Sequence, residues 1–406
     1  MTNPQGYMFI SYRSTQLPVV LRLRRRLEEF GIPVWHDKDS MPPGMLEKGM
    51  RDAVRHEDCA GAIVWLSRDV AASTAIQRIE LPEIFQRVQR DDQFFVGLCL
   101  ADGLTFDTAQ AVIASQYSNI NVKSFLLLPI GDSSTEADDI ENVSRLLLEK
   151  RLSNITSRLE AAAPLRIYVA GHVAPPATVQ HALVMDYRPL FERRIATGAN
   201  WARILSALDF AASSVARHAQ GRVVLAEGRP QLSLALALGY AFRTPRGIQA
   251  NWQQINPDST SQEWSLESLS EPQGFGIKSS TDLLHGQDMA VLIGITNDPG
   301  PTFDASASVL PRFGVVIRLS PKDGRFPASV RSSSEASALT QAILREIRSV
   351  VRETRLQGSI HFFIAGPAGV AFLLGRQLNT LGTVHCYEHE ASGLIGVYRP
   401  NLTMNT

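Results

Sequence analysis

The sequence has few cysteines, no excess of charge of either sign and no long hydrophobic run. Its 40 basic and 40 acidic side chains cancel, which removes the electrostatic footprint of a DNA-binding or membrane-surface protein. The longest apolar run, near residues 232–242, is too short to cross a bilayer and is interrupted by Gly239. We therefore expect no membrane and no DNA partner, and an anionic ligand would need a local basic pocket.

The three cysteines, Cys59, Cys99 and Cys386, lie far apart in apolar segments and show no metal-ligand spacing. This pattern predicts buried thiols in a reducing compartment, and hence a cytoplasmic protein without a metal site. His36 and Asp39 share a short segment, but no further ligands converge on them.

Strand patterns alternate with helical patterns along the first part of the chain. Apolar strand-like segments occupy residues 6–12, 32–35, 59–67, 94–100 and 125–130, and amphipathic helical spacing covers 17–30, 46–54, 75–89 and 142–162. This alternation predicts an α/β fold with a parallel sheet covered by helices on both faces. Pro164 ends the last of these helices, so we predict two domains, 1–158 and 164–406.

The second domain contains a weak internal repeat. Residues 221–239 and 358–375 each read as a strand, a glycine turn and an apolar helix with a glycine at nearly the same place, and each is followed by another strand pattern. The repeat predicts two related halves, 164–285 and 286–406, which meet where their strands end. Ligands of open α/β sheets bind at that edge.

Three motifs of the first domain together resemble the sequence boxes of TIR domains, over about residues 5–155. They are Phe9-Ile-Ser-Tyr12, then Trp35-x-Asp37 followed by Met41 and Gly44, and finally Ser67 and Ser73 ahead of Glu80-Leu81. The resemblance implies a flavodoxin-like fold and, in the NAD-cleaving members, hydrolysis of the bond between nicotinamide and ribose.

In such TIR domains the glutamate of the third motif is catalytic, which points to Glu80. A carboxylate there would stabilise the positive charge that develops on the ribose as nicotinamide leaves. Pro82 and a spacing one residue longer than usual make Glu83 a second candidate. The residues expected around NAD are Ser11, Tyr12, Arg13, Trp35, Asp37, Lys38 and Ser73. The residues expected in the self-assembly loop are Asp39, Met41, Pro42 and Gly44.

The second domain, over about residues 165–406, resembles the SAVED domain, a fusion of two CARF-like (Rossmann-like) halves. The resemblance lies in Ala237-Leu-Gly-Tyr-Ala-Phe242, in Ile364-Ala-Gly-Pro367 with Phe372-Leu-Leu-Gly375, and in Tyr398-Arg-Pro-Asn-Leu402. It implies binding of a cyclic oligonucleotide made by a partner nucleotidyltransferase. A TIR–SAVED fusion further resembles effectors of CBASS, a bacterial antiphage defence.

A cyclic oligonucleotide needs helix N-termini and basic side chains for its phosphates, and aromatic or amide groups for its bases. The residues expected to supply them are Tyr187, Arg229, Gln231, Gly366, Pro367, Ala368, Arg376 and Tyr398. Gly366-Pro-Ala-Gly369 with Glu388 at the end of the next strand is also compatible with a dinucleotide site, but the second glycine of that fingerprint is missing.

These observations favour an NAD+ hydrolase that a cyclic di- or trinucleotide activates and that depletes NAD+ in abortive infection. NAD+ would be a substrate, with no cofactor bound permanently. Ligand binding would drive homo-oligomerisation, in which the loop 38–48 of one TIR domain packs on the next and completes its site. One alternative is a non-catalytic TIR adaptor assembled by a nucleotide signal. A second is an oxidoreductase that binds NAD through residues 165–406.

Overall fold

The computed structural model divides the chain into two compact units, which we describe separately. The first comprises residues 1–161 and 176–185, and the second comprises residues 162–175 and 186–406. The structure describes residues 2–35, 46–68, 76–114, 117, 120, 125–131, 134–175, 180–255, 260–267, 275–325, 329–391 and 396–406. The first division lies close to the boundary expected at 158–164, but the segment 176–185 was not expected to belong to the first unit.

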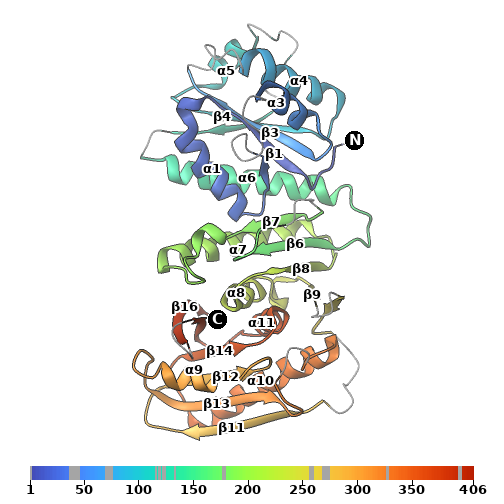
Figure 1. Cartoon of the computed structure of the whole chain (residues 1–406). Helices are drawn as coiled ribbons and strands as arrows, with labels where there is room; N and C mark the ends of the chain where they lie inside the picture. Colours follow the sequence, from blue (N-terminus) through green and yellow to red (C-terminus); the bar gives the residue numbers. More distant parts are fainter. Residues whose placement is uncertain are drawn as a thin grey trace. The chain divides into compact units, whose positions relative to one another are not determined.

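A parallel five-stranded sheet forms the centre of the first unit (Figure 1). Its strands are β1 (Tyr7–Ser11), β2 (Val34–Trp35), β3 (Cys59–Leu66), β4 (Phe95–Leu100) and β5 (Leu126–Pro129). They lie in the order β2-β1-β3-β4-β5. This is the flavodoxin-like order, in which the direction of winding reverses between β1 and β3. The α/β fold expected from the alternating pattern is therefore confirmed.

Helices accompany this sheet at most of the positions that the spacing predicted. They are α1 (Leu17–Glu29), α3 (Leu46–Arg55), α4 (Leu81–Arg90), α5 (Phe106–Ala114) and α6 (Glu136–Thr156), with the 3-10 turn η1 (Ser14–Gln16) before α1. Helix α1 buries Val19, Val20, Leu23 and Leu27, the apolar stripe read from the sequence. Helix α5 was not predicted, because its nine residues give too few turns for a clear period.

The helix expected over residues 75–89 begins with a local irregularity. Residues Ile76–Glu80 form a π-helical turn, and the regular helix α4 starts only at Leu81. Pro82 occupies the first turn of α4, where a missing N–H is tolerated, so the proline sets the start of the helix. π-Helical turns are frequent at functional sites, which directs attention to Glu80.

A buried arginine ties the segment 180–185 into the first unit. Arg151 of α6 donates from Nε to the carbonyl of Ala182 (2.8 Å), from Nη1 to that of Gly6 (2.6 Å) and from Nη2 to that of Gln5 (2.5 Å). The three acceptors are neutral, and burial lowers the pKa of Arg151 to about 9. The guanidinium thus holds the start of β1 and this returning segment together.

We expect Arg151→Met to lower the melting temperature of the full-length protein by several degrees. The substitution leaves three buried carbonyl groups without a donor, a cost of about 3 kcal/mol or more. Arg145→Met on the same helix is the matched control, because Arg145 makes a partly exposed ion pair with Glu141 that is worth less than about 1 kcal/mol. Calorimetry on both variants checks this, and equal melting temperatures would contradict the assigned role.

The first half of the second unit contains a mostly parallel sheet in the order β10-β9-β8-β6. Its strands are β6 (Leu165–Ala170), β8 (Val224–Arg229), β9 (Ala250–Ile255) and β10 (Ser261–Trp264), while β7 (Leu183–Asp186) spans the boundary between the two units. Its helices are η5 (Arg188–Leu190), α7 (Gly198–His218), α8 (Leu232–Ala241) and η6 (Thr244–Arg246). Among the residues described, no helix is both long and apolar enough to cross a membrane.

The second half is built on a six-stranded sheet in the order β11-β13-β12-β14-β15-β16. Its strands are β11 (Ile277–Leu283), β12 (Asp288–Gly294), β13 (Phe313–Pro321), β14 (Ile360–Ala365), β15 (Thr383–Glu390) and β16 (Val397–Asn405), and its helices are α9 (Gly300–Ala305), α10 (Ser333–Thr354) and α11 (Ala368–Gly375). Strand β11 corrects the expected division at residue 285. Its residues are polar and mostly exposed, and they form an edge strand antiparallel to β13 in the sheet of the second half.

The three cysteines lie in the sheets, as their apolar surroundings predicted. Cys59, Cys99 and Cys386 are free and buried. Burial raises the pKa of the Cys59 and Cys99 thiols to about 12, so neither forms a thiolate at neutral pH. Their part in the protein is packing.

Candidate functional site

Two of the residues expected around NAD, Ser11 and Trp35, lie at the carboxyl edge of the first sheet. Strand β1 ends at Ser11 and β2 ends at Trp35, and because the strands are parallel their ends lie at one edge. Ser11 is 1% exposed, and its Oγ has no hydrogen-bond partner within the described part of the chain. The half-buried Trp35 stacks on Phe9 with ring centroids 5.2 Å apart. The edge therefore offers an aromatic wall and a buried hydroxyl group.

Glu80 immediately precedes α4, the helix that follows β3, and it is only 4% exposed. Glu80 comes after β3, whose carboxyl end lies at the same edge of the sheet as Ser11. A carboxylate held at the start of a helix and shielded from water can act strongly on a nearby developing charge.

Glu83 has a different environment. Its two carboxylate oxygens accept hydrogen bonds from Arg55 Nη2 (2.6 Å) and Nε (2.7 Å), and Arg51 lies 3.5 Å away. Glu83 also borders a polar cavity of about 570 Å³ lined in part by Thr2 and Arg87. The bidentate pair therefore occupies both oxygens of the Glu83 carboxylate.

The remaining expected residues of the first unit are only partly covered. Tyr12 and Arg13 directly follow Ser11 and are half-buried. Asp37, Lys38 and Ser73, and the assembly-loop residues Asp39, Met41, Pro42 and Gly44, lie outside the described residues. Their roles stay predictions.

In the second unit, α8 and α11 approach each other through reciprocal glycine contacts. A Cβ atom on Gly239 of α8 would lie 2.0 Å from the carbonyl oxygen of Phe372, and one on Gly375 of α11 would lie 2.1 Å from that of Leu236. Only glycine permits this approach of the two backbones. The repeated glycine read from the sequence is thus the point where the two halves touch.

The N-terminus of α8 is already occupied by a carboxylate of the other half. Glu388 of β15 accepts hydrogen bonds from the backbone N–H (2.8 Å) and the hydroxyl group (2.7 Å) of Ser233. Asn401 adds a bond to Ser233 Oγ (2.9 Å) and accepts one from Trp201 Nε1 (2.9 Å). The sequence suggested a free anion site here and, separately, a ribose contact for Glu388. Both expectations are corrected, because the acid caps α8.

The corresponding position of the other half has no charge. In the parallel registers Ala226 pairs with Trp252, and Phe362 pairs with Cys386, so Gln254 occupies the place on β9 that Glu388 occupies on β15. A Cβ atom on Gly369 of α11 would lie 2.9 Å from Gln254 Oε1. The two turns are therefore alike in backbone and different in charge.

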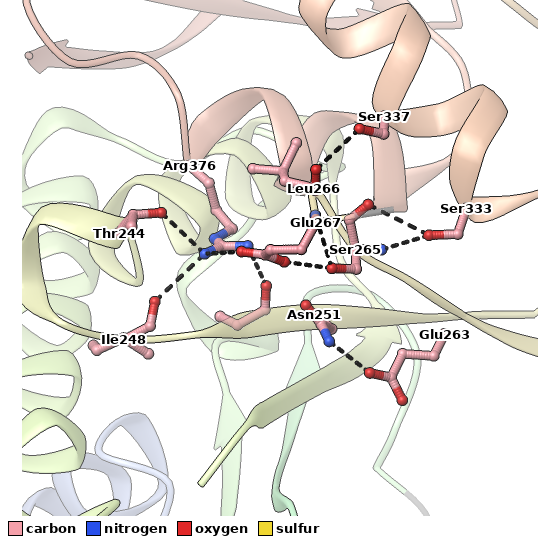
Figure 2. Close-up of polar contacts among 11 residues, drawn as sticks. Thr244, Ile248, Asn251, Glu263, Ser265, Leu266, Glu267, Ser333, Ser337 and Arg376 are labelled. Atoms are coloured by element: carbon pink, nitrogen blue, oxygen red, sulfur yellow. Dashed lines mark hydrogen bonds and ion pairs between the residues drawn. The ribbon is translucent and has the colours of Figure 1, made fainter. Parts of the chain in front are cut away.

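The side chain of Arg376 is hydrogen-bonded to other residues of the protein (Figure 2). Its guanidinium is buried and donates to the carbonyl groups of Ala250 and Ile248 and to Thr244 Oγ1 (3.1 Å), while Glu267 lies 3.8 Å away. Burial lowers its pKa. Arg376 joins α11 to the first half, and we do not include it in the ligand-binding set.

The other residues expected at the nucleotide site also divide by burial. Tyr187 and Tyr398 lie in the core, at 0% and 3% exposure. Arg229 is exposed at the end of β8, and Gln231 is buried beside it. Gly366, Pro367 and Ala368 form the turn between β14 and α11. The sequence patterns did not indicate two basic residues near the α8 turn, His172 and Arg194. Neither belongs to a motif, and folding alone brings them there.

We expect Gly239→Ala to destabilise the second unit strongly, because the added methyl group would overlap a backbone carbonyl of α11. Overpacking of this kind costs about 1–3 kcal/mol or more. Gly198→Ala, at the start of α7, is the control. Nothing lies within 4 Å of its would-be Cβ atom, so its effect should be neutral or slightly stabilising. Thermal unfolding of both variants measures the difference, and similar melting temperatures would refute the contact.

Comparison with known families agrees with this division. The family described as "TIR domain" matches residues 8–122, and the family described as "SMODS-associated and fused to various effectors sensor domain" (SAVED) matches residues 208–404. The chain joins a TIR domain to a SAVED domain. Both parts of the resemblance read from the sequence are thereby confirmed.

One curated relative is CD-NTase-associated protein 4 of Enterobacter hormaechei subsp. hoffmannii (strain UCI 50), 30% identical over 163 residues. The match covers 39% of this chain and 31% of the relative, so the chain spans about a third of that protein's length.

Solved structures show the fold. The Acinetobacter baumannii Cap4 SAVED/CARF-domain containing receptor, with the cyclic trinucleotide 3′3′3′-cAAA, is 14% identical to this chain at a TM-score of 0.50, covering 90% of this chain and 87% of that one. The same receptor with 2′3′3′-cAAA gives the same values.

Proposed function

We propose that this protein is an NAD+ hydrolase activated by a cyclic oligonucleotide. The observation that carries the proposal is the burial of Glu80 directly before helix α4, in a chain whose two parts match the TIR and SAVED families. The structurally similar Acinetobacter baumannii receptor was solved with two cyclic trinucleotides, which supports a ligand of the same class here.

The chemistry asked of Glu80 is electrostatic. When the bond between nicotinamide and ribose breaks, positive charge develops on the sugar, and a carboxylate close to it lowers the barrier. Trp35 and Ser11 would wall the pocket and position the substrate. Such positioning matters because small displacements of a reacting group are costly.

We expect Glu80→Gln to reduce nicotinamide release at least 100-fold, since the amide keeps the shape of the side chain and removes its charge. Glu83→Gln should retain most activity, because the carboxylate of Glu83 is engaged by Arg55. Both variants are assayed with NAD+ and a panel of cyclic di- and trinucleotides. Loss of activity in Glu83→Gln alone would reverse the assignment.

The path of the chain supports coupling between the two units. The backbone passes from one unit to the other three times, at residues 161–162, 175–176 and 185–186. The segment fixed by Arg151 lies between Gly171 and Tyr187, and Tyr187 N–H donates to the carbonyl of Ala170 at the end of β6 (2.9 Å).

We expect the activating cyclic nucleotide to convert the protein from a small species to a larger homo-oligomer. Assembly would complete the TIR sites. NAD+ cleavage would therefore stay low until the signal arrives. Light scattering with and without ligand measures this, with Glu80→Gln as a variant that should assemble without turnover. An unchanged particle mass in the presence of an activating ligand would refute ligand-driven assembly.

The non-catalytic adaptor predicts binding and assembly without nicotinamide release. The burial of Glu80 at the edge of the sheet favours the hydrolase, because an acid that merely solvates a helix would be exposed.

A further inference from the structure

Three basic residues from separate segments lie near the first turn of α8. Arg229 ends β8, where it is paired in register with Ala170 of β6, and His172 lies just beyond Ala170. Arg194 belongs to the turn between Glu192 and Ile195, and its carbonyl oxygen accepts a bond from Asn401, the residue that also bonds Ser233 of α8. We refer to His172, Arg194 and Arg229 as the basic cluster.

The charges of Arg194 and Arg229 both act on His172, and the charge of Arg194 also acts on the buried carboxyl group of Glu388. Arg194 and Arg229 form no ion pair with any residue that the structure describes, and all three side chains are exposed. The acidic side chains around them already have other partners. Glu227 pairs with Arg166, Asp186 pairs with Arg188, and Glu388 caps α8. The cluster therefore stores repulsion that an anion would relieve.

A buried amide beside the cluster offers an unused acceptor. Gln231 is 0% exposed, and its Nε2 donates to the carbonyl of Gly171 (3.2 Å). Its Oε1 has no partner in the described part of the chain, and it lies 1.9 Å from where a Cβ atom of Gly171 would be. The oxygen thus occupies the space beside the residue that precedes His172. Buried polar atoms without partners are rare, and one at a turn between a sheet and a helix indicates a missing donor.

We propose that the basic cluster binds a phosphate group of the cyclic oligonucleotide, while Gln231 Oε1 accepts a hydrogen bond from a base amino group or ribose hydroxyl. This rests on the proposed function. Because Glu388 occupies the end of α8, the phosphate lies over Arg194 and Arg229 rather than on the helix terminus. The cluster gives the first half the charge of the site, and the turn Gly366–Gly369 with Gln254 leaves the second half neutral.

The position of His172 makes this binding sensitive to pH. Partial burial and the charges of Arg194 and Arg229 lower the pKa of His172, which favours the neutral imidazole in the free protein. A bound phosphate opposes those two charges and raises the pKa, and a ligand that raises a pKa binds more tightly as the pH falls. The affinity should therefore rise several-fold from pH 8 to pH 6.

The test is calorimetric titration of the full-length protein with the tightest binder of a panel of cyclic di- and trinucleotides at pH 6, 7 and 8. Arg194→Ala and Arg229→Ala should each weaken binding about 10- to 100-fold and reduce its dependence on salt. Arg193→Ala, the neighbouring cation of the same turn, should stay within about twofold. His172→Gln should remove the rise in affinity towards pH 6, and unchanged melting temperatures would show that the variants are folded.

The outcomes separate two failures. If the wild-type protein binds no member of the panel, the proposed function falls and the basic cluster falls with it. If the wild-type protein binds tightly but Arg194→Ala and Arg229→Ala bind as well as Arg193→Ala, the proposed function stands and the assignment of the cluster is overturned. A pH dependence that persists in His172→Gln would remove His172 from the site.

Discussion

The reciprocal contact between α8 and α11 is the constraint on which the SAVED domain depends. Gly239 and Gly375 let each helix backbone rest on a carbonyl group of the other, so the two halves cannot slide without a clash. Glu388 and Arg376 then reach from the second half into the first, one to cap a helix and the other to bond the carbonyl groups near the start of β9. Contact at this distance joins the two repeats into one compact unit.

Within that unit the two repeats differ in side chains near the starts of α8 and α11. Glu388 and Gln254 hold equivalent places, as do Ser233 and Gly369, yet one pair forms a buried charged cap and the other does not. A symmetric pair of helix termini would present two equal anion sites. Filling one of them with a protein carboxylate makes the surrounding arginines, rather than the helix end, the source of positive charge.

The TIR domain shows the same dependence on environment. Glu80 and Glu83 are three residues apart on one stretch of chain, but one is shielded at the edge of the sheet and the other is held by Arg55. Their chemical identity is the same, and only the partners that folding supplies distinguish them. The same holds for two buried cations. Arg151 and Arg376 both donate hydrogen bonds to backbone carbonyl groups inside the protein.

The sequence by itself determined the α/β class, the alternation of strands and helices in a parallel sheet, the buried cysteines, both domain families and the glycine repeat. These follow from local periodicity and short motifs, which act over a few residues. The sequence did not predict helix α5, the edge strand β11 or the place of segment 180–185, because their placement depends on pairing with distant residues. Only the tertiary structure showed that Glu80 is buried while Glu83 is paired with Arg55, and that Arg376, Tyr187 and Tyr398 are buried. It also placed the charges of Arg194 and Arg229 where they act on His172. Burial and charge partners arise from residues far apart in the chain, so no local pattern encodes them.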